Sequence, residues 1–317
     1  MKYTIVNNMR ISQLTLGTAQ LGFHYGVANT RGKLDRKNAR EILKSATDHG
    51  ITCFDTAPTY GDSEKEIGSF LTYYQPILEI PLIVSKLPAV NLGVEATSNS
   101  MYSWVKDNVI KSIDKLHIKS IPIYLLHRAS DMYSNNGLVI ESLLKLHDEG
   151  LIGLVGISVY TPEEVEMVLN VKVIKAIQLP INIFDHRLIK TGLLNRIVDR
   201  DVVVFVRSVF LQGLFFLDVD KLPIGLEQAK EPLIKLHQLS QKWEIDIAQI
   251  ALCFVRDLPG INSIVIGAET TDQVINNINL LCAMPLPPDL KTEIMTVFSN
   301  LPPTLINPSL WNYTSTH

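Results

Sequence analysis

Residues 51–61 read ITCFDTAPTYG, and this stretch decides the fold expected for the chain. Its first four residues form an apolar run that Asp55 closes, and Tyr60 follows in a turn-rich segment. Ahead of it, residues 41–49 place apolar side chains at helical spacing, and Gly50 supplies a left-handed helix stop. The stretch therefore predicts a helix, a short buried strand, a polar strand end and a loop, which is the repeating unit of a parallel α/β fold.

The same unit recurs along the chain. The helical pattern of residues 143–149 ends at Gly150 before another apolar run, and a capping residue, a proline and two acids at 161–164 predict a helix start. We expect a single-domain α/β fold, a (β/α)8 TIM-type barrel, with a six-stranded open sheet as the main alternative. A small strand pair over residues 1–10 would cap the barrel floor. The candidate strands are residues 12–17, 51–55, 81–86, 122–127, 152–157, 173–179, 202–206 and 263–266.

The composition excludes several classes of partner. The 317 residues carry 29 basic and 32 acidic side chains, a net charge of −3, so no basic surface for nucleic acid is indicated. No apolar run approaches the roughly 20 residues that span a bilayer, and the N-terminus lacks a signal-peptide layout. The cysteines, Cys53, Cys253 and Cys282, show no metal-ligand spacing and suit a reducing compartment. We therefore expect a cytoplasmic protein with no metal, membrane or nucleic-acid partner.

Polar residues stand where several predicted strands end. Asp55, Lys86 and His127 close the apolar runs 51–54, 82–85 and 123–126, and Tyr60 lies five residues past Asp55. Singly, each fits an ordinary role: a turn residue, a solvated strand end, a core histidine, a surface aromatic. A parallel barrel, however, builds its active site at the carboxyl ends of its strands. An acid, an amine, an imidazole and a phenol gathered there can donate a proton to a carbonyl.

These four residues and their surroundings resemble the aldo-keto reductase superfamily. The matching stretches are LGTA at 16–19, FDTAPTYG at 54–61, SK at 85–86 and LH at 126–127, within a likeness that runs from about residue 11 to about residue 298. The resemblance implies nicotinamide-dependent reduction of an aldehyde or ketone. Tyr60 would be the general acid, Lys86 would favour its phenolate, Asp55 would hold Lys86, and His127 would orient the substrate oxygen.

The resemblance also implies a set of cofactor contacts. Val159 stands where the family usually has Asn, and Arg207 stands where it commonly has an aromatic that stacks on nicotinamide; a planar guanidinium can also stack. The cofactor is NADP or NAD. No Arg or Lys lies between Gly267 and Asn277 to bind a 2′-phosphate, so we expect NAD(H) to serve at least as well as NADP(H). The expected contacts are Gly17, Thr18, Ser158, Gln178, Arg207, Ser208, Leu211, Gly213, Gly267, Glu269, Gln273 and Asn277.

The substrate would be a small-molecule carbonyl held by loops above the strand ends. The first loop and the tail, residues 299–317, mix aromatics with amides, which suits a sugar or sugar derivative. In relatives the tail folds over the pocket, although a frayed terminus is the alternative. The candidate contacts are His24, Tyr25, Arg128 and Trp311. Two other functions stay open: a cofactor-binding sensor or subunit with little turnover, and a metal-dependent barrel hydrolase.

Overall fold

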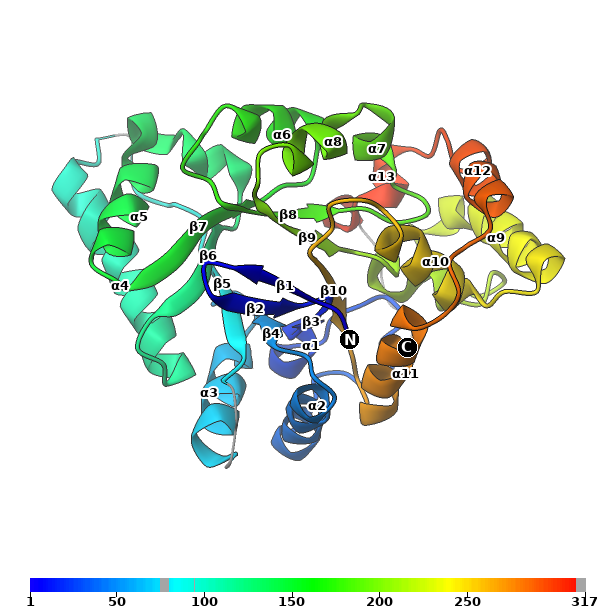
Figure 1. Ribbon diagram of the computed structural model, residues 1–317, viewed down its shortest axis with the longest axis horizontal. Helices are drawn as coiled ribbons and strands as arrows, with labels where there is room; N and C mark the ends of the chain where they lie inside the picture. Colours follow the sequence, from blue (N-terminus) through cyan, green and yellow to red (C-terminus); the bar gives the residue numbers. More distant parts are fainter. Residues whose placement is uncertain (75–79, 94, 312–317) are drawn as a thin grey trace.

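The computed structural model describes residues 1–74, 80–93 and 95–311. Over these residues, eight parallel strands close into a barrel in the order β10-β3-β4-β5-β6-β7-β8-β9 (Figure 1). The single-domain (β/α)8 prediction is confirmed, and the open six-stranded sheet is wrong. The barrel strands are β3 Leu14–Gly17, β4 Cys53–Asp55, β5 Leu82–Leu87, β6 Ile121–Leu126, β7 Ile152–Ser158, β8 Ala176–Pro180, β9 Val203–Arg207 and β10 Ser263–Gly267.

Every predicted apolar run contains a strand, and in three of them, 12–17, 51–55 and 173–179, the strand begins two or three residues later than expected. In the run 12–17, Ser12 belongs to a separate hairpin strand, so β3 begins at Leu14. In the run 173–179, the backbone N–H of Ile174 donates to the carbonyl of Val171 at 3.2 Å in a turn, although Ile174 is buried. The apolar runs therefore predicted which side chains are buried, but they did not predict where each strand begins.

Helices surround the barrel on its outer face (Figure 1). The capping box predicted at Thr161 is present, because its hydroxyl accepts from the N–H of Glu164 while Glu164 accepts from the N–H of Thr161. The helices are α1 Ala19–Gly22, α2 Arg36–Asp48, α3 Ser63–Tyr73, α4 Ser98–Leu116, α5 Leu138–Asp148, α6 Pro162–Leu169, α7 Arg187–Lys190, α8 Leu193–Val198, α9 Lys230–Trp243, α10 Ile247–Arg256, α11 Thr271–Leu281, α12 Pro288–Val297 and α13 Pro303–Ile306. Among the described residues, none of these helices combines the length and apolar character that a membrane crossing requires.

An antiparallel hairpin closes the amino end of the barrel. Strands β1 Tyr3–Val6 and β2 Met9–Ser12 pair across a turn in which Asn7 and Asn8 have φ of 46° and 62°. Both values suit a two-residue hairpin turn. The side chain of Ile11 is fully buried against the interior side chains of the barrel, which are Cys53, Val84, Ile123, Leu125, Leu154, Ala176, Val203, Phe205 and Val265. The floor is therefore filled and apolar, which leaves the carboxyl end for a site.

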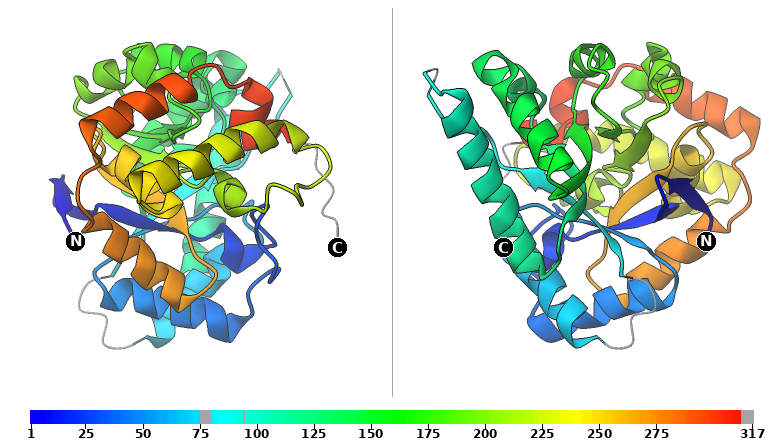
Figure 2. Two further views of the ribbon diagram at one scale, coloured as in Figure 1. Left: turned by 90° about the vertical axis from the view of Figure 1, so that its right-hand side faces the viewer. Right: turned by 60° about the vertical axis from the view of Figure 1, so that its left-hand side comes forward.

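The C-terminal segment packs on the side of the barrel opposite the hairpin, as the left view of Figure 2 shows for α13. The hydroxyl of Thr304 donates to Oε1 of Gln228 at 3.0 Å, and Nε2 of Gln228 donates to the carbonyl of Thr304 at 3.2 Å. The indole N–H of Trp311 donates to the carbonyl of Leu305 at 3.0 Å. The segment is thus attached up to Trp311, and the rest of the expected tail, residues 312–317, lies outside the described residues.

Candidate active site

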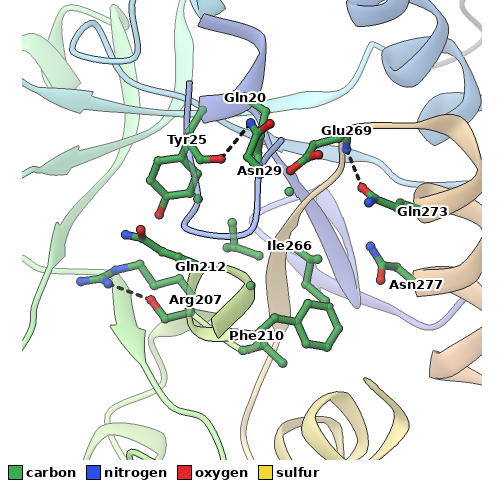
Figure 3. A pocket seen from close by; sticks show the side chains of 18 of the residues that line it. Gln20, Tyr25, Asn29, Arg207, Phe210, Gln212, Ile266, Glu269, Gln273 and Asn277 are labelled. Carbon is green, nitrogen blue, oxygen red and sulfur yellow. Dashed lines mark hydrogen bonds between the residues drawn. The ribbon is translucent and has the colours of Figure 1, made fainter. Parts of the chain in front are cut away.

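A cavity of ≈ 540 Å³ opens at the carboxyl ends of β3, β4, β9 and β10 (Figure 3). Its wall is built from strand-end residues, the loop after β3, the loop after β9 and the start of α11. Many of the residues expected at a cofactor or substrate site meet there, although they come from distant parts of the chain. Those that line it are Gly17, Thr18, Tyr25, Asp55, Tyr60, Arg207, Ser208, Gly213, Gly267, Glu269, Gln273 and Asn277.

A buried ion pair lies at the base of the site. Nζ of Lys86 donates to Oδ1 of Asp55 at 2.7 Å and to the carbonyl of Thr56 at 3.0 Å. Lys86 is 0% exposed and Asp55 is 4% exposed, so neither charge is offset by water. Nε2 of Gln178 also donates to Oδ1 of Asp55 at 2.7 Å. A buried ammonium needs such a partner, and the strand ends of β4, β5 and β8 supply the pair and its support.

The ring of Tyr60 lies beside this pair. Nζ of Lys86 is 4.8 Å from the Tyr60 ring centroid, and the His127 ring centroid is 6.0 Å away at an interplanar angle of 82°. The loop that carries Tyr60 is locked by two glycines. A Cβ on Gly22 would come within 1.5 Å of the Tyr60 carbonyl oxygen, and a Cβ on Gly61, where φ is +55°, within 2.4 Å of the Gly22 carbonyl oxygen. Only glycine permits this approach, so the two loops fix the phenol together.

The phenol of Tyr60 holds its proton tightly. Burial raises its pKa well above the ordinary value, and the negative charge of Asp55 raises it further, while Arg207 lowers it. The interpretation from sequence gave the lowering role to Lys86. Because Asp55 lies 2.7 Å from that ammonium and balances its charge, the cation that favours the phenolate here is Arg207. Tyr60 is therefore a neutral proton donor at neutral pH.

His127 is neutral in this environment. Burial lowers its pKa to about 3, and the positive charges of Lys86, Arg207 and Arg128 all act in the same direction. Its Nδ1 lies 3.5 Å from Oγ1 of Thr59. A neutral imidazole carries one N–H donor and one acceptor nitrogen, so His127 can donate a hydrogen bond to a carbonyl oxygen next to Tyr60.

Two loops that line the cavity are joined to each other. We call residues 25–29 and 210–213 together the strap. The backbone N–H of Val27 donates to the carbonyl of Gln212 at 3.0 Å, and a Cβ on Gly213, where φ is +90°, would lie 2.6 Å from Cβ of Ala28. Gly213 therefore permits the contact that closes the strap. Figure 3 shows Tyr25, Asn29 and Gln212 from these loops around the cavity.

The start of α11 forms the far end of the cavity in Figure 3. The backbone N–H of Glu269 donates to Oε1 of Gln273 at 2.7 Å, and Oγ1 of Thr270 accepts from the N–H of Gln273 at 3.1 Å. Burial raises the pKa of Glu269, whereas the positive charges of Arg31 and His24 lower it. The segment 267–277 carries no cation, as the sequence indicated, but the charges of two basic side chains of the first loop act on the carboxyl group of Glu269.

Several predicted contacts lie elsewhere. The side chain of Leu211 is 0% exposed in the core, so its side chain does not face a ligand. Ser158 and Gln178 are buried behind the wall, and Gln178 is engaged with Asp55. Lys86 and His127 stand beside Tyr60 and are not on the wall itself.

Three of the four expected substrate contacts do not line the cavity either. Nε2 of His24 is hydrogen-bonded to the carbonyl of Asn29 at 2.8 Å. The guanidinium of Arg128 lies 3.7 Å from a carboxylate oxygen of Asp131, and Trp311 bonds within its own segment. Each of these side chains has a partner within its own loop or tail, which the sequence does not reveal, and their contacts to substrate stay predictions.

The cavity also has wall residues that sequence reasoning did not single out. Phe210 and Phe216 come from the loop after β9, with ring centroids 5.3 Å apart, and Ala248 and Leu280 come from α10 and α11. Apolar residues in loops and on helices carry no pattern that separates a pocket wall from core.

Among the described residues, no group of three His, Cys, Asp or Glu side chains is placed to hold a metal ion. The three cysteines are free, with Cys53 and Cys253 buried and Cys282 exposed. The polar groups that the structure does bring together are an ammonium, a carboxylate, a phenol and an imidazole at a deep cavity. Such a set can donate a proton to a carbonyl oxygen and stabilise the charge that develops there.

The sequence model of the Aldo/keto reductase family matches residues 13–296, so the chain belongs to this family. It is an oxidoreductase of a family whose members act on small carbonyl compounds with NAD(P)H. The chain is 23% identical over 300 residues to aldo-keto reductase YhdN of Bacillus subtilis, covering 86% of this chain and 87% of that protein. It is 24% identical over 310 residues to L-glyceraldehyde 3-phosphate reductase of Escherichia coli, covering 88% and 87%.

Solved structures share the fold. The aldo-keto reductase AKR11C1 from Bacillus halodurans, in its holo form, superposes with a TM-score of 0.74 at 22% identity, covering 94% of this chain and 96% of that one. The glycerol dehydrogenase AKR11B4 from Gluconobacter oxydans gives a TM-score of 0.71 at 20% identity, covering 100% and 97%. These likenesses establish the architecture that positions the site.

Proposed function

We propose that this protein reduces an aldehyde or ketone to an alcohol with NAD(P)H, with Tyr60 as the proton donor. One observation carries the proposal: a neutral, half-buried phenol lies beside a fully buried Lys86–Asp55 pair and a neutral His127, at the edge of the cavity.

The cavity wall suits a dinucleotide. Gly17, Gly213 and Gly267 line it, and a Cβ on Gly267 would collide with the amide of Gln20 at 2.3 Å. The N-terminus of α11 at the far end has free N–H groups, which favour an anion. The residues proposed to hold the cofactor are therefore those of the wall. When bound, the nicotinamide supplies the hydride, because no side chain can.

The protein's own residues would handle the proton and the charge. Tyr60 donates its proton to the carbonyl oxygen as that oxygen gains negative charge, and the nearby cation Arg207 stabilises the phenolate left behind. The N–H of neutral His127 donates to the same oxygen and helps to orient it. Asp55 keeps Lys86 in place throughout. In the reverse direction, the phenolate accepts the alcohol proton.

The test is the Tyr60→Phe variant. We expect its turnover to fall about 10²- to 10⁴-fold, the usual contribution of a positioned proton donor, while cofactor still binds. Tyr73→Phe is the matched control, because Tyr73 is 73% exposed on α3 and loses the same hydroxyl. Near-normal turnover in Tyr60→Phe with a substrate that the native protein reduces well would contradict the assignment.

The alternative proposal is a cofactor-binding sensor or subunit in the cytoplasm, and one measurement distinguishes it from the reductase. It predicts that the native protein binds NAD(P)H but does not oxidise it with any of a panel of carbonyls. The Tyr60 environment favours the enzyme, because a buried charge pair next to a phenol is costly to maintain without a chemical use.

For the substrate, we propose a sugar or sugar derivative. The cavity wall carries the amides of Gln20 and Gln212 next to the Tyr25 ring, and such groups bond hydroxyls and cover ring faces. Relatives named for L-glyceraldehyde 3-phosphate and for glycerol point to small hydroxylated compounds. A panel of sugars, keto-sugars and simple aldehydes tests this; higher kcat/KM for unsubstituted alkyl aldehydes would contradict it.

For the cofactor, we propose that NAD(H) is used at least as well as NADP(H). Glu269 lines the far end of the cavity, where its carboxylate can accept hydrogen bonds from ribose hydroxyls and would repel a 2′-phosphate. Fluorescence titration with both reduced cofactors measures the preference. We expect Glu269→Gln to shift it toward NADPH by about tenfold, the effect of removing one adverse charge. A hundredfold native preference for NADPH would overturn the proposal.

A further inference from the structure

Arg207 is a cation in the active site with no acidic partner. It ends β9 and lines the cavity together with Asp55 and Tyr60. Among the described residues, no carboxylate lies within ion-pair distance of its guanidinium. The other cations nearby are matched: Lys86 pairs with Asp55 at 2.7 Å, and Arg128 lies 3.7 Å from Asp131. The region around Tyr60 therefore carries one uncompensated positive charge.

The guanidinium is held in place by neutral groups. One terminal nitrogen donates to the carbonyl of Val159 at 3.0 Å, and the other donates to Oγ of Ser208 at 3.3 Å. Its central carbon lies 3.9 Å from the centroid of the Tyr160 ring, in a cation–π contact. A guanidinium has five N–H donors, so most of them remain available. Neutral groups of the protein thus orient the Arg207 guanidinium, and its positive charge remains available to a ligand.

The charge of Arg207 reaches the reacting groups. It lowers the pKa values of Tyr60, Tyr25 and His127, so it is electrostatically close to all three. Figure 3 shows Arg207 near Tyr25 and Gln212, away from Glu269, Gln273 and Asn277 at the opposite end of the cavity. A ligand anion at Arg207 would therefore be near the proton donor and distant from the start of α11.

We propose that Arg207 makes this protein selective for carbonyl substrates that carry an anionic group, a carboxylate or a phosphate, a short distance from the carbonyl carbon. The inference rests on the reductase function proposed above and names its substrate class. The guanidinium fork matches both anions through paired N–H···O bonds. The carbonyl is reduced with the proton from Tyr60, and the anionic group passes through the reaction unchanged.

Two matched substrate pairs test the proposal. The carboxylate arm compares 4-oxobutanoate with its methyl ester, and the phosphate arm compares glyceraldehyde 3-phosphate with glyceraldehyde. For each pair we measure the ratio of kcat/KM for the charged compound to that for the neutral one. Any change in cofactor binding or in Tyr60 acidity affects both members of a pair equally, so it cancels in the ratio.

We expect the native protein to prefer the charged member of at least one pair, chiefly through a lower KM. Arg207→Gln should reduce that ratio by about 10- to 100-fold, the range for a hydrogen-bonded charge contact. Arg207→Lys should retain part of it, because it keeps the charge and loses the fork. Arg196→Gln, which removes an exposed guanidinium 3.5 Å from Glu166, should leave the ratio unchanged.

Three outcomes would overturn the proposal. If the native protein reduces neutral members of both pairs as well as charged ones, Arg207 serves only Tyr60 or the cofactor, and the reductase function stands. If a charged preference persists undiminished in Arg207→Gln, another group binds the anion. If no carbonyl of either kind is reduced by the native protein, the reductase function fails as well, and the substrate class fails with it.

Discussion

The floor and the mouth of this barrel are equally buried and chemically opposite. At the floor, apolar side chains such as Cys53, Val84 and Ala176 fill the interior beneath the hairpin. At the mouth, Asp55, Lys86 and Gln178 are nearly as inaccessible to water and are joined by hydrogen bonds. The floor gains stability by excluding water from hydrocarbon, whereas the mouth loses solvation and recovers it only through pairing.

The same strands build both regions. Cys53 and Asp55 on β4, Val84 and Lys86 on β5, and Ala176 and Gln178 on β8 are each two residues apart. Because side chains alternate along a strand, residues two apart point to the same face. One interior face therefore changes from apolar to charged over a single step of about 6–7 Å. Position along the strand, and not the identity of the strand, decides whether a side chain stabilises the fold or serves the site.

Lys86→Met gives the largest expected effect, because it replaces one member of the buried ion pair at the mouth with an apolar side chain and keeps the other member. It leaves the buried carboxylate of Asp55 without its cation, which typically costs about 3–5 kcal/mol of unfolding free energy, and it removes a charge next to Tyr60. We expect carbonyl reduction to be nearly lost. Adding Asp55→Asn should recover much of the stability, measured by urea unfolding, without recovering turnover. Equal stability of the single and double variants would argue against the pairing.

Ile11→Ala tests the floor, where we expect a loss of stability without a loss of turnover. Ile11 is fully buried where the hairpin meets the barrel interior, so truncation should cost about 2–5 kcal/mol by thermal or urea unfolding. Turnover per folded molecule should stay near the native value, because the mouth is untouched. Ile5→Ala in the same hairpin is the control: Ile5 is 64% exposed, and we expect a change within about 0.5 kcal/mol. A large loss of kcat in Ile11→Ala would mean that floor and mouth are coupled.

The last effect concerns His127 and the pH dependence of stability. Its folded pKa is lowered to about 3, below the ordinary value near 6.5, so unfolding takes up a proton between these limits. The stability contributed by neutral His127 is present above about pH 6.5 and declines as pH falls toward 3, by at most about 1.4 kcal/mol per pH unit for one proton. His127→Gln should flatten this part of the stability profile. An unchanged slope would show that the imidazole is not buried as described.

Much of the fold was readable because its signals are local. An apolar run followed by Asp55 or Lys86 reports strand and strand end within a few residues, and the barrel follows from eight such units. The group of Asp55, Tyr60, Lys86 and His127 was readable for the same reason. The balance of charges could not be predicted from the sequence. The effect of Lys86 on Tyr60 depends on the 2.7 Å distance between Nζ of Lys86 and Oδ1 of Asp55, which lies 31 positions away in the chain.

Contacts between loops could not be predicted from the sequence either. Nothing in the order of residues brings the charge of Arg31 close enough to act on Glu269 or attaches Trp311 to Leu305. Gly22 carried no signal of its own, yet it permits the approach that positions Tyr60. Such features depend on contacts between separate loops above the strand ends, and these contacts leave no periodic pattern in the sequence.

The strap has a kinetic consequence. Loops that line the cavity and are hydrogen-bonded to each other through Val27 and Gln212 restrict the path of an elongated ligand. Entry and exit of a dinucleotide then require a local opening, which a single backbone bond resists by only about 0.5–1.5 kcal/mol but which must also separate the close contact of Gly213 with Ala28. Local openings of this kind occur on microsecond to second timescales. We therefore expect the residence time of the spent cofactor, and not the proton transfer at Tyr60, to set the maximum rate of turnover.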